Sequence, residues 1–114
     1  MTLHIKATSI ELTPSLKTYV EEKIGSLDRF LKRWEREGDV GVWVEVGRTT
    51  RHHLKGDVFR AEVTILMPHK KILRADAADA DVRVAVNRVR DLISSEIERY
   101  KEKQGVDRRV RRAE

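Results

Sequence analysis

Two segments near the middle of the chain alternate between apolar and other side chains. Valine occupies positions 40, 42, 44 and 46, and apolar residues also occupy positions 59, 61, 63, 65 and 67. This period of two predicts two half-buried β-strands that each turn one apolar face toward a core. A shorter alternation predicts a strand over residues 3–8, and a fourth strand is predicted at about Lys71–Asp76, after a turn at Pro68-His69.

The segment after the first strand repeats apolar residues every three or four positions, the period of an amphipathic helix. Thr13 is a favourable N-cap residue, and Pro14 suits the first helical position. The spacing predicts one continuous helix from Pro14 to about Glu35. Gly25 weakens such a helix, and we expect close packing at this position to explain its presence.

A second helix is predicted from about Ala80 to Lys103, with Asp79 or Asp81 as its cap. Its apolar stripe leaves basic side chains on both flanks. One flank carries Arg83, Arg90 and Lys101, and the opposite flank carries Arg88, Arg99 and Lys103. Six acidic residues of the segment balance these six cations, so a solvated helix with local ion pairs is an equally good interpretation.

The resulting order, βαβββα, predicts an α+β fold. We expect a four-stranded, mostly antiparallel sheet with two helices packed on one face. The other face of the sheet would expose His4, Lys6, Trp43, Glu45, Arg60, Glu62 and Arg74. Trp43 there would shield its neighbouring strands or, less commonly, offer a platform for a base. The sequence further predicts a single domain over residues 1–104 and a basic, flexible tail at 105–114.

The charge of the chain is high and biased toward cations. Among 114 residues there are 24 Lys and Arg against 19 Asp and Glu, a net charge of +5, and the isoelectric point is near 9.7. An isoelectric point above 9 is one mark of nucleic-acid binding. A highly charged surface also occurs in heat-adapted proteins, and that alternative stays open.

A second group of cations lies in and after the connector at residues 48–57. The stretch Arg48–Gly56 contains Arg48, Arg51 and Lys55 and no acidic residue, and Lys70, Lys71 and Arg74 follow. Such side chains can reach RNA phosphates without burying charge. The alternative is an ordinary polar hairpin loop.

Several classes of function find no support in the sequence. The chain has no cysteine, its four histidines lack a recognised ligand spacing, and no catalytic carboxylate pair or glycine-rich phosphate loop stands out. We therefore expect no enzymatic activity, no metal and no cofactor. No apolar run is long enough to span a membrane, and the start lacks a signal-peptide pattern, so we expect a cytoplasmic protein without a membrane partner.

Several segments in order resemble one known family. The stretch Ile10–Leu16 followed by Tyr19–Ile24 is similar to its opening pattern, and His53–Glu62, Leu73-Arg74-Ala75 and Arg99–Lys103 resemble later parts. The chain resembles, over about residues 2–104, the ribosome hibernation-promoting factors, also called ribosome-associated inhibitors or sigma-54 modulation proteins. By position, Lys23, Arg99, Lys101 and Lys103 match basic residues of the family pattern.

The resemblance implies a concrete role. Members of the family bind the small (30S) ribosomal subunit in the channel of messenger RNA and of the A- and P-site transfer RNAs. They contact 16S ribosomal RNA with basic residues of the helices and adjoining loops, and they block translation on idle ribosomes under stress. Long members add a C-terminal dimerisation domain, so this chain resembles a short form, and a separate ribosome-dimerising partner stays unknown.

The last helix departs from the family pattern at five positions. Arg83 replaces an aromatic residue, Val84 an alanine and Asn87 an aspartate, while Leu92 and Ser95 stand where basic residues are common. We infer that Arg83, Arg88 and Arg90 compensate by adding charge elsewhere on the helix. Two other functions stay open: a general RNA-binding module, and a protein-binding regulator that uses the open face of the sheet.

Overall fold

The computed structural model describes residues 1–49 and 58–113, with side chains up to Gly105. Its elements occur in the order β1 (Thr2–Thr8), α1 (Pro14–Gly25), α2 (Asp28–Glu35), β2 (Gly41–Thr49), β3 (Val58–Leu66), the 3-10 turn η1 (Pro68–Lys70), β4 (Ile72–Asp79) and α3 (Val82–Ala113). The predicted α+β fold is confirmed. Two cations of the connector, Arg51 and Lys55, lie outside the described residues.

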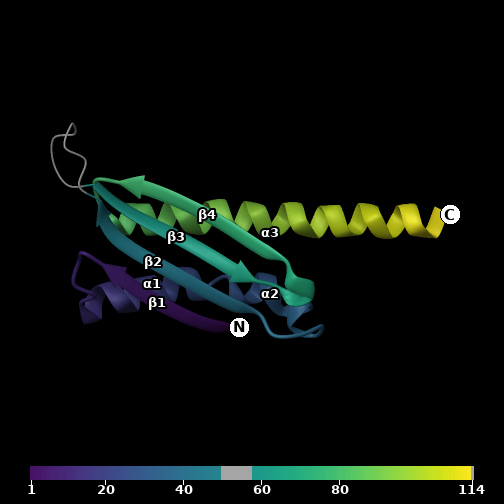
Figure 1. Cartoon of the computed structure of the whole chain (residues 1–114), viewed down its shortest axis with the longest axis horizontal. Helices are drawn as coiled ribbons and strands as arrows, with labels where there is room; N and C mark the ends of the chain where they lie inside the picture. The colour runs from purple at the N-terminus through teal and green to yellow at the C-terminus, as the bar shows by residue number, and fades with distance from the viewer. Residues whose placement is uncertain (50–57, 114) are drawn as a thin grey trace.

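The four strands lie in the order β1-β2-β3-β4 (Figure 1). The two hairpin pairings, β2–β3 and β3–β4, are antiparallel, whereas β1 and β2 are parallel. The prediction of a mostly antiparallel sheet is therefore confirmed, and the sheet as a whole is mixed. Parallel neighbours need a crossover connection, and α1 and α2 supply it between β1 and β2.

Both helical segments cover the same face of the sheet, with α1 and α2 behind β1 and β2, and α3 behind β3 and β4 (Figure 1). The buried face carries the alternating apolar residues that the sequence predicts, among them Val42, Val44 and Val63. The opposite face is open and exposes His4, Lys6, Trp43, Glu45, Arg60 and Arg74, while Glu62 is half-buried. The single core lies between the sheet and the helices.

The first helical segment is broken, which corrects the prediction of one helix from Pro14 to about Glu35. α1 ends at Gly25, and Ser26 closes it by donating from its hydroxyl to the carbonyl of Lys23 at 2.6 Å. A Cβ at Gly25 would meet nothing within 4 Å, so close packing does not explain this glycine. Its low helix propensity favours the break instead, because Gly costs about 1 kcal/mol relative to Ala inside a helix.

Near the C-terminal end of α2, Trp34 anchors the long helix α3. Its indole N–H donates to the side-chain oxygen of Gln104 at 2.9 Å, and its ring stacks on Tyr100 with 5.5 Å between centroids. Gln104 in turn donates to the Tyr100 hydroxyl at 2.9 Å. α3 therefore leaves the body of the protein in a fixed direction.

Beyond this anchor α3 projects past the sheet (Figure 1) and continues to Ala113, whereas the sequence predicted an end near Lys103. A single glycine, Gly105, is too weak a stop signal to end a helix of good helix formers. Residues 105–113 thus continue the helix. The division into a domain and a flexible tail stays a prediction.

The amino group of Met1 links the start of β1 to α2. It lies 2.8 Å from Oε1 of Glu35 and 3.5 Å from Oδ1 of Asp28. The hydrogen bond to Glu35 raises the pKa of this amino group above its usual value, because the carboxylates stabilise the charged form.

We expect Trp34→Phe to lower the free energy of unfolding by about 1–2 kcal/mol, because it leaves the side chain of Gln104 without its indole donor. Urea denaturation followed by circular dichroism measures the change. Lys32→Ala, at an exposed position of the same helix, is the matched control and should change stability by less than about 0.5 kcal/mol. Equal stabilities of Trp34→Phe and the control would show that the anchor contributes nothing.

Candidate nucleic-acid interface

The most structured basic region is a groove between α1 and α3. It consists of two adjoining shallow recesses that share Glu22. We call the two recesses together the interhelical groove; its lining residues are Pro14, Ser15, Thr18, Tyr19, Glu22, Lys23, Ser26, Arg83, Asn87, Arg90 and Asp91. Three predicted RNA-binding residues, Lys23, Arg83 and Arg90, therefore meet in one place although they come from distant parts of the chain.

Hydrogen bonds across the groove hold its two arginines. Arg83 donates from Nη2 to the Ser15 hydroxyl at 2.9 Å, and Arg90 donates from Nε to the Ser26 hydroxyl at 3.3 Å. The phenol of Tyr19 donates to the main-chain carbonyl of Arg83 at 3.4 Å. α1 and α3 thus run side by side in the same direction, and the small polar residues of α1 position the cations of α3.

The ring of Tyr19 lies between α1 and α3 and contacts two cations. The guanidinium carbon of Arg83 is 5.0 Å from the ring centroid, and the ammonium of Lys23 is 5.6 Å from it. Both distances are within the reach of a cation–π interaction. The ring therefore stabilises a cluster of positive charge that would otherwise repel itself.

Negative charge in the groove limits its attraction for anions. Arg90 forms an ion pair with Asp91 at 3.2 Å, and Glu22 lines both recesses. The groove holds three cations and two carboxylates, so its excess of positive charge is small. A polyanion would have to compete with Asp91 for Arg90.

The opposite flank of α3 carries Arg88, Arg99 and Lys103, as the helical spacing predicts. Arg88 donates to the carbonyl of Ala78 at 2.9 Å, and Arg99 pairs with Glu96 at 3.0 Å. These contacts match the alternative of a solvated helix with local ion pairs. Exposed pairs of this kind contribute only about 0–1 kcal/mol, so they do not prevent contact with phosphate.

A further basic area forms where η1 leads into β4. Lys70 and Lys71 are exposed, and the ammonium of Lys71 lies 5.5 Å from the ring of Tyr100. Because Tyr100 lies one helical turn before Lys103, the structure brings these lysines close to the end of the basic flank of α3. Lys101, also exposed, lies on the flank that α3 turns toward α1.

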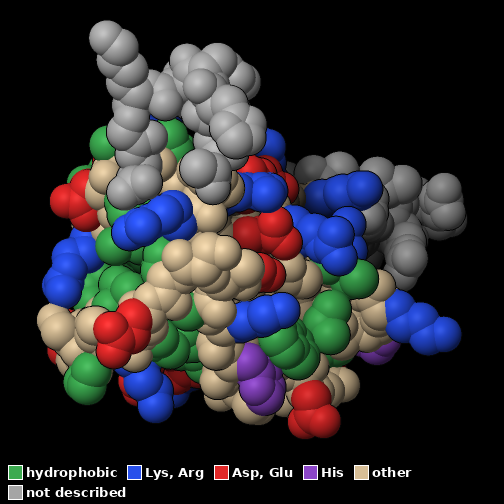
Figure 2. Space-filling view, turned by 60° about the vertical axis from the view of Figure 1, so that its left-hand side comes forward, with side chains coloured by type: hydrophobic (Ala, Val, Ile, Leu, Met, Phe, Trp, Pro, Cys, Tyr) green, Lys and Arg blue, Asp and Glu red, His purple; other side chains and the backbone are tan. Residues whose placement is uncertain are grey.

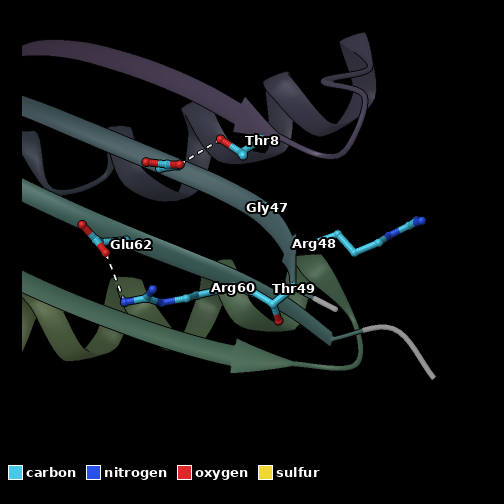
Figure 3. Close-up of a pocket in the computed structure, with 7 residues that line it drawn as sticks. Thr8, Gly47, Arg48, Thr49, Arg60 and Glu62 are labelled. Carbon is cyan, nitrogen blue, oxygen red and sulfur yellow. Dashed lines mark hydrogen bonds and ion pairs between the residues drawn. The ribbon is translucent and has the colours of Figure 1, made fainter. Parts of the chain in front are cut away.

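Two predicted RNA-binding residues lie on strands of the sheet. Arg74 is exposed on the open face of the sheet, in register with Thr64 of β3. Arg48 lies near the end of β2 and is among the residues that line the pocket in Figure 3, and its guanidinium carbon is 5.5 Å from the centroid of the Phe59 ring. The structure therefore does not combine all predicted cations into one surface.

The pocket beside Arg48 lies on the open face and contains paired polar groups. Thr8 donates to Glu45 at 2.8 Å, and Arg60 lies 3.2 Å from Glu62 (Figure 3). Arg60 also lies 3.1 Å from Asp76. On the face drawn in Figure 2, basic and acidic side chains are interspersed with hydrophobic ones, and no broad area of one sign is visible. The surface around this pocket therefore offers little net attraction for RNA.

The sequence interpretation overlooked the polar and aromatic side chains that complete the groove. Tyr19 and Lys23 are spaced four residues apart on α1 and could have been paired on that basis. Ser15 and Ser26 gave no comparable signal, because their partners lie more than sixty positions away on α3.

Two further features bear on the chemistry of the protein. Among the side chains that the structure describes, in residues 1–49 and 58–105, no three of His, Asp or Glu lie close enough to hold a metal ion. In the same part of the chain, no helix combines the length and apolar character of a membrane span.

We expect Lys23→Glu to weaken retention on heparin more than Lys6→Glu, because Lys23 lies in the interhelical groove and Lys6 on the open face of the sheet. The two variants change the net charge equally and are therefore matched. The salt concentration at elution is the measurement, with circular dichroism as the test of folding. Equal elution of the two variants would contradict an anion-binding role of the groove.

Comparisons with known proteins agree with this architecture. Relatives named ribosome hibernation promotion factor, from Lactococcus lactis subsp. cremoris (strain MG1363) and Deinococcus radiodurans (strain R1), are 27% and 28% identical over 99 and 97 residues. These alignments cover 86% and 85% of this chain but 48% and 47% of the relatives. The chain thus spans about half the length of these two relatives.

Two solved structures share the fold. The N-terminal domain of Protein Y from Thermus thermophilus has a TM-score of 0.68 at 24% identity, covering 88% of this chain and 99% of that domain. A ribosomal subunit interface protein from Coxiella burnetii has a TM-score of 0.66 at 13% identity, covering 90% and 99%. The family described as "Sigma 54 modulation protein / S30EA ribosomal protein" matches residues 3–105, and the chain belongs to this family.

Proposed function

We propose that this protein is a ribosome hibernation factor that binds the small ribosomal subunit and blocks translation. In this proposal it contacts 16S ribosomal RNA and occupies the channel of messenger RNA and of the A- and P-site transfer RNAs. The observation that carries the proposal is the family match over residues 3–105, which includes the sheet except for Thr2 and the whole interhelical groove. The names of the two curated relatives support the same role.

The proposed mechanism is steric and electrostatic. Cations of the groove and of the α3 flanks contact phosphates and thereby position the domain, while its shape selects the site. The helices are packed on the sheet in one core, so the cations are presented by a rigid body and little order is lost on binding. No bond is made or broken in this mechanism.

A protein-binding regulator is a second candidate, which the open face of the sheet favours. Leu66 pairs with Ile72 across β3 and β4, and both side chains are exposed. Trp43, also exposed, lies over Gly41 and stacks on His4 at 4.7 Å between ring centroids. This arrangement fits the shielding role of Trp43 rather than a base platform, and it leaves an apolar strip suited to a protein surface. Nuclease treatment separates the two candidates. It would abolish binding that depends on RNA and would leave binding to a protein partner unchanged.

We expect binding to isolated small subunits to weaken steeply with salt, because each phosphate contact contributes about 0.7–0.9 to the slope of log affinity against log salt. Arg99→Glu combined with Lys101→Glu should weaken binding and lower this slope by about 1.4–1.8, the contribution of two lost contacts. Both positions lie off the apolar stripe of α3 and are exposed, so the fold should persist. Co-sedimentation at several salt concentrations measures affinity and slope.

Lys6→Glu on the open face is the control for these measurements and should keep the wild-type slope. Circular dichroism on the same samples should show unchanged helix content. Binding that does not depend on salt would refute the electrostatic mechanism. An unchanged slope in the double variant would instead place the interface away from the end of α3.

We expect the protein to compete with messenger RNA and initiator transfer RNA for the small subunit, because all three would occupy the same channel. Filter binding with subunits loaded beforehand measures the competition. Simultaneous, independent binding of all three would contradict occlusion of the channel. It would favour a general RNA-binding module instead.

A further inference from the structure

The recess at the N-terminal end of the interhelical groove differs from the rest of the basic surface. It has a volume of about 430 Å³ and is lined by Pro14, Ser15, Thr18, Tyr19, Glu22 and Arg83. The starts of α1 and α3 meet here, and the recess opens beside Lys23 and Arg90, which line the adjoining recess. We call it the terminal recess. Among its lining residues, one aromatic ring, one guanidinium and one carboxylate lie together.

Arg83 is fixed in the terminal recess although its side chain is exposed. Its Nη2 donates to the Ser15 hydroxyl at 2.9 Å, and its guanidinium lies 5.0 Å from the centroid of the Tyr19 ring. The phenol of Tyr19 also donates to the main-chain carbonyl of Arg83 at 3.4 Å. A planar group held from two sides loses little freedom when a ligand stacks on it.

The chemistry of the terminal recess suits a base better than a phosphate. Unpaired RNA bases stack on aromatic rings and on guanidinium planes. The recess offers the guanidinium of Arg83, whereas the Tyr19 ring is already in contact with Arg83 and Lys23. Glu22 would repel a phosphate, but its carboxylate accepts hydrogen bonds from the amino group of a base.

The N-terminal ends of α1 and α3, which lie beside the recess, also have fewer free main-chain N–H donors for a phosphate than uncapped helices would have. The amide of Leu16 already donates to the Thr13 hydroxyl at 3.1 Å, and the amide of Arg83 donates to Asp81 at 2.8 Å. Side-chain caps thus satisfy one first-turn donor of each helix.

We propose that the terminal recess binds one unpaired nucleobase that carries an exocyclic amino group. The base stacks on the guanidinium of Arg83 and donates its amino hydrogens to Glu22, while Lys23 and Arg90 contact the phosphates on either side. This inference rests on the proposed function in one respect, since it takes RNA as the ligand. It adds a selectivity for base chemistry that an electrostatic surface alone would not have.

Short oligomers of cytidine and uridine test the role of Glu22, because these pyrimidines differ at position 4, where cytosine has an amino group and uracil an oxygen. Fluorescence anisotropy with labelled hexamers should give affinities at least about threefold higher for cytidine, a difference of roughly 0.7 kcal/mol. Glu22→Gln should bring the ratio close to one, because an amide can accept from cytosine and also donate to uracil. Equal affinities for the wild-type protein, or an unchanged ratio in Glu22→Gln, would overturn the proposal.

The role of Arg83 is tested by Arg83→Lys, which keeps the positive charge and removes the planar guanidinium group. Affinity for the cytidine oligomer should fall severalfold while the slope against salt stays unchanged, because stacking is lost and charge is not. The matched control is Arg29→Lys, since Arg29 lies 4.7 Å from the ring of Phe30 on α2, outside the groove. Equal affinities of Arg83→Lys and Arg29→Lys would overturn the proposed stacking.

Co-sedimentation with small subunits distinguishes failure of this inference from failure of the proposed function. If the wild-type protein binds subunits but does not distinguish the oligomers, the terminal recess is not a base site and the proposed function stands. If it distinguishes the oligomers but does not bind subunits, the base site stands and the ribosomal function fails.

Discussion

The packing of the apolar stripe of α3 on the sheet determines where the charges of this helix lie. Val86, Val89, Ile93 and Ile97 are all buried against the inner face. Full burial of such a side chain contributes about 1.5–3 kcal/mol, far more than any exposed ion pair on the same helix. The rotation of α3 is therefore fixed by its core residues. As a consequence, Arg83 and Arg90 must face α1, and Arg88 must face the end of β4.

Because the ion pairs are weak compared with core burial, the cations of α3 can be paired with carboxylates in the free protein and still be available to bind a phosphate. Arg90 forms an ion pair with Asp91, and Arg99 forms one with Glu96, so both cations already have an acidic partner in the isolated protein. Exposed pairs contribute little, because water screens them and two side chains lose freedom. A phosphate can replace the carboxylate at small cost. The core supplies the stability, and the surface pairs hold the cations near positions where RNA could meet them.

The sequence predicts the parts of this fold that depend on local periodicity. Alternation located β2 and β3 to within about two residues, and the stripe of α3 gave its two basic flanks. Other features were missed, for different reasons. The parallel pairing of β1 with β2 follows from a crossover, and the break at Gly25 follows from a weak propensity that periodicity alone does not weigh. Ser15 joins the candidate site only because α1 and α3 run side by side.

The two faces of the protein differ in a way that favours one orientation on RNA. Across the open face, one register row joins Lys6, Glu45, Glu62 and Asp76, a cation followed by three carboxylates. Like charges on neighbouring strands destabilise a sheet unless they are compensated, and Arg60 compensates two of the three. Replacing that compensation by a phosphate would leave the carboxylates facing another anion. On the helix face, Asp91 and Glu96 are each paired with one arginine, Arg90 and Arg99 respectively. In the proposed complex with RNA, electrostatics therefore favours contact through α1 and α3, which would leave the apolar strip of the sheet accessible.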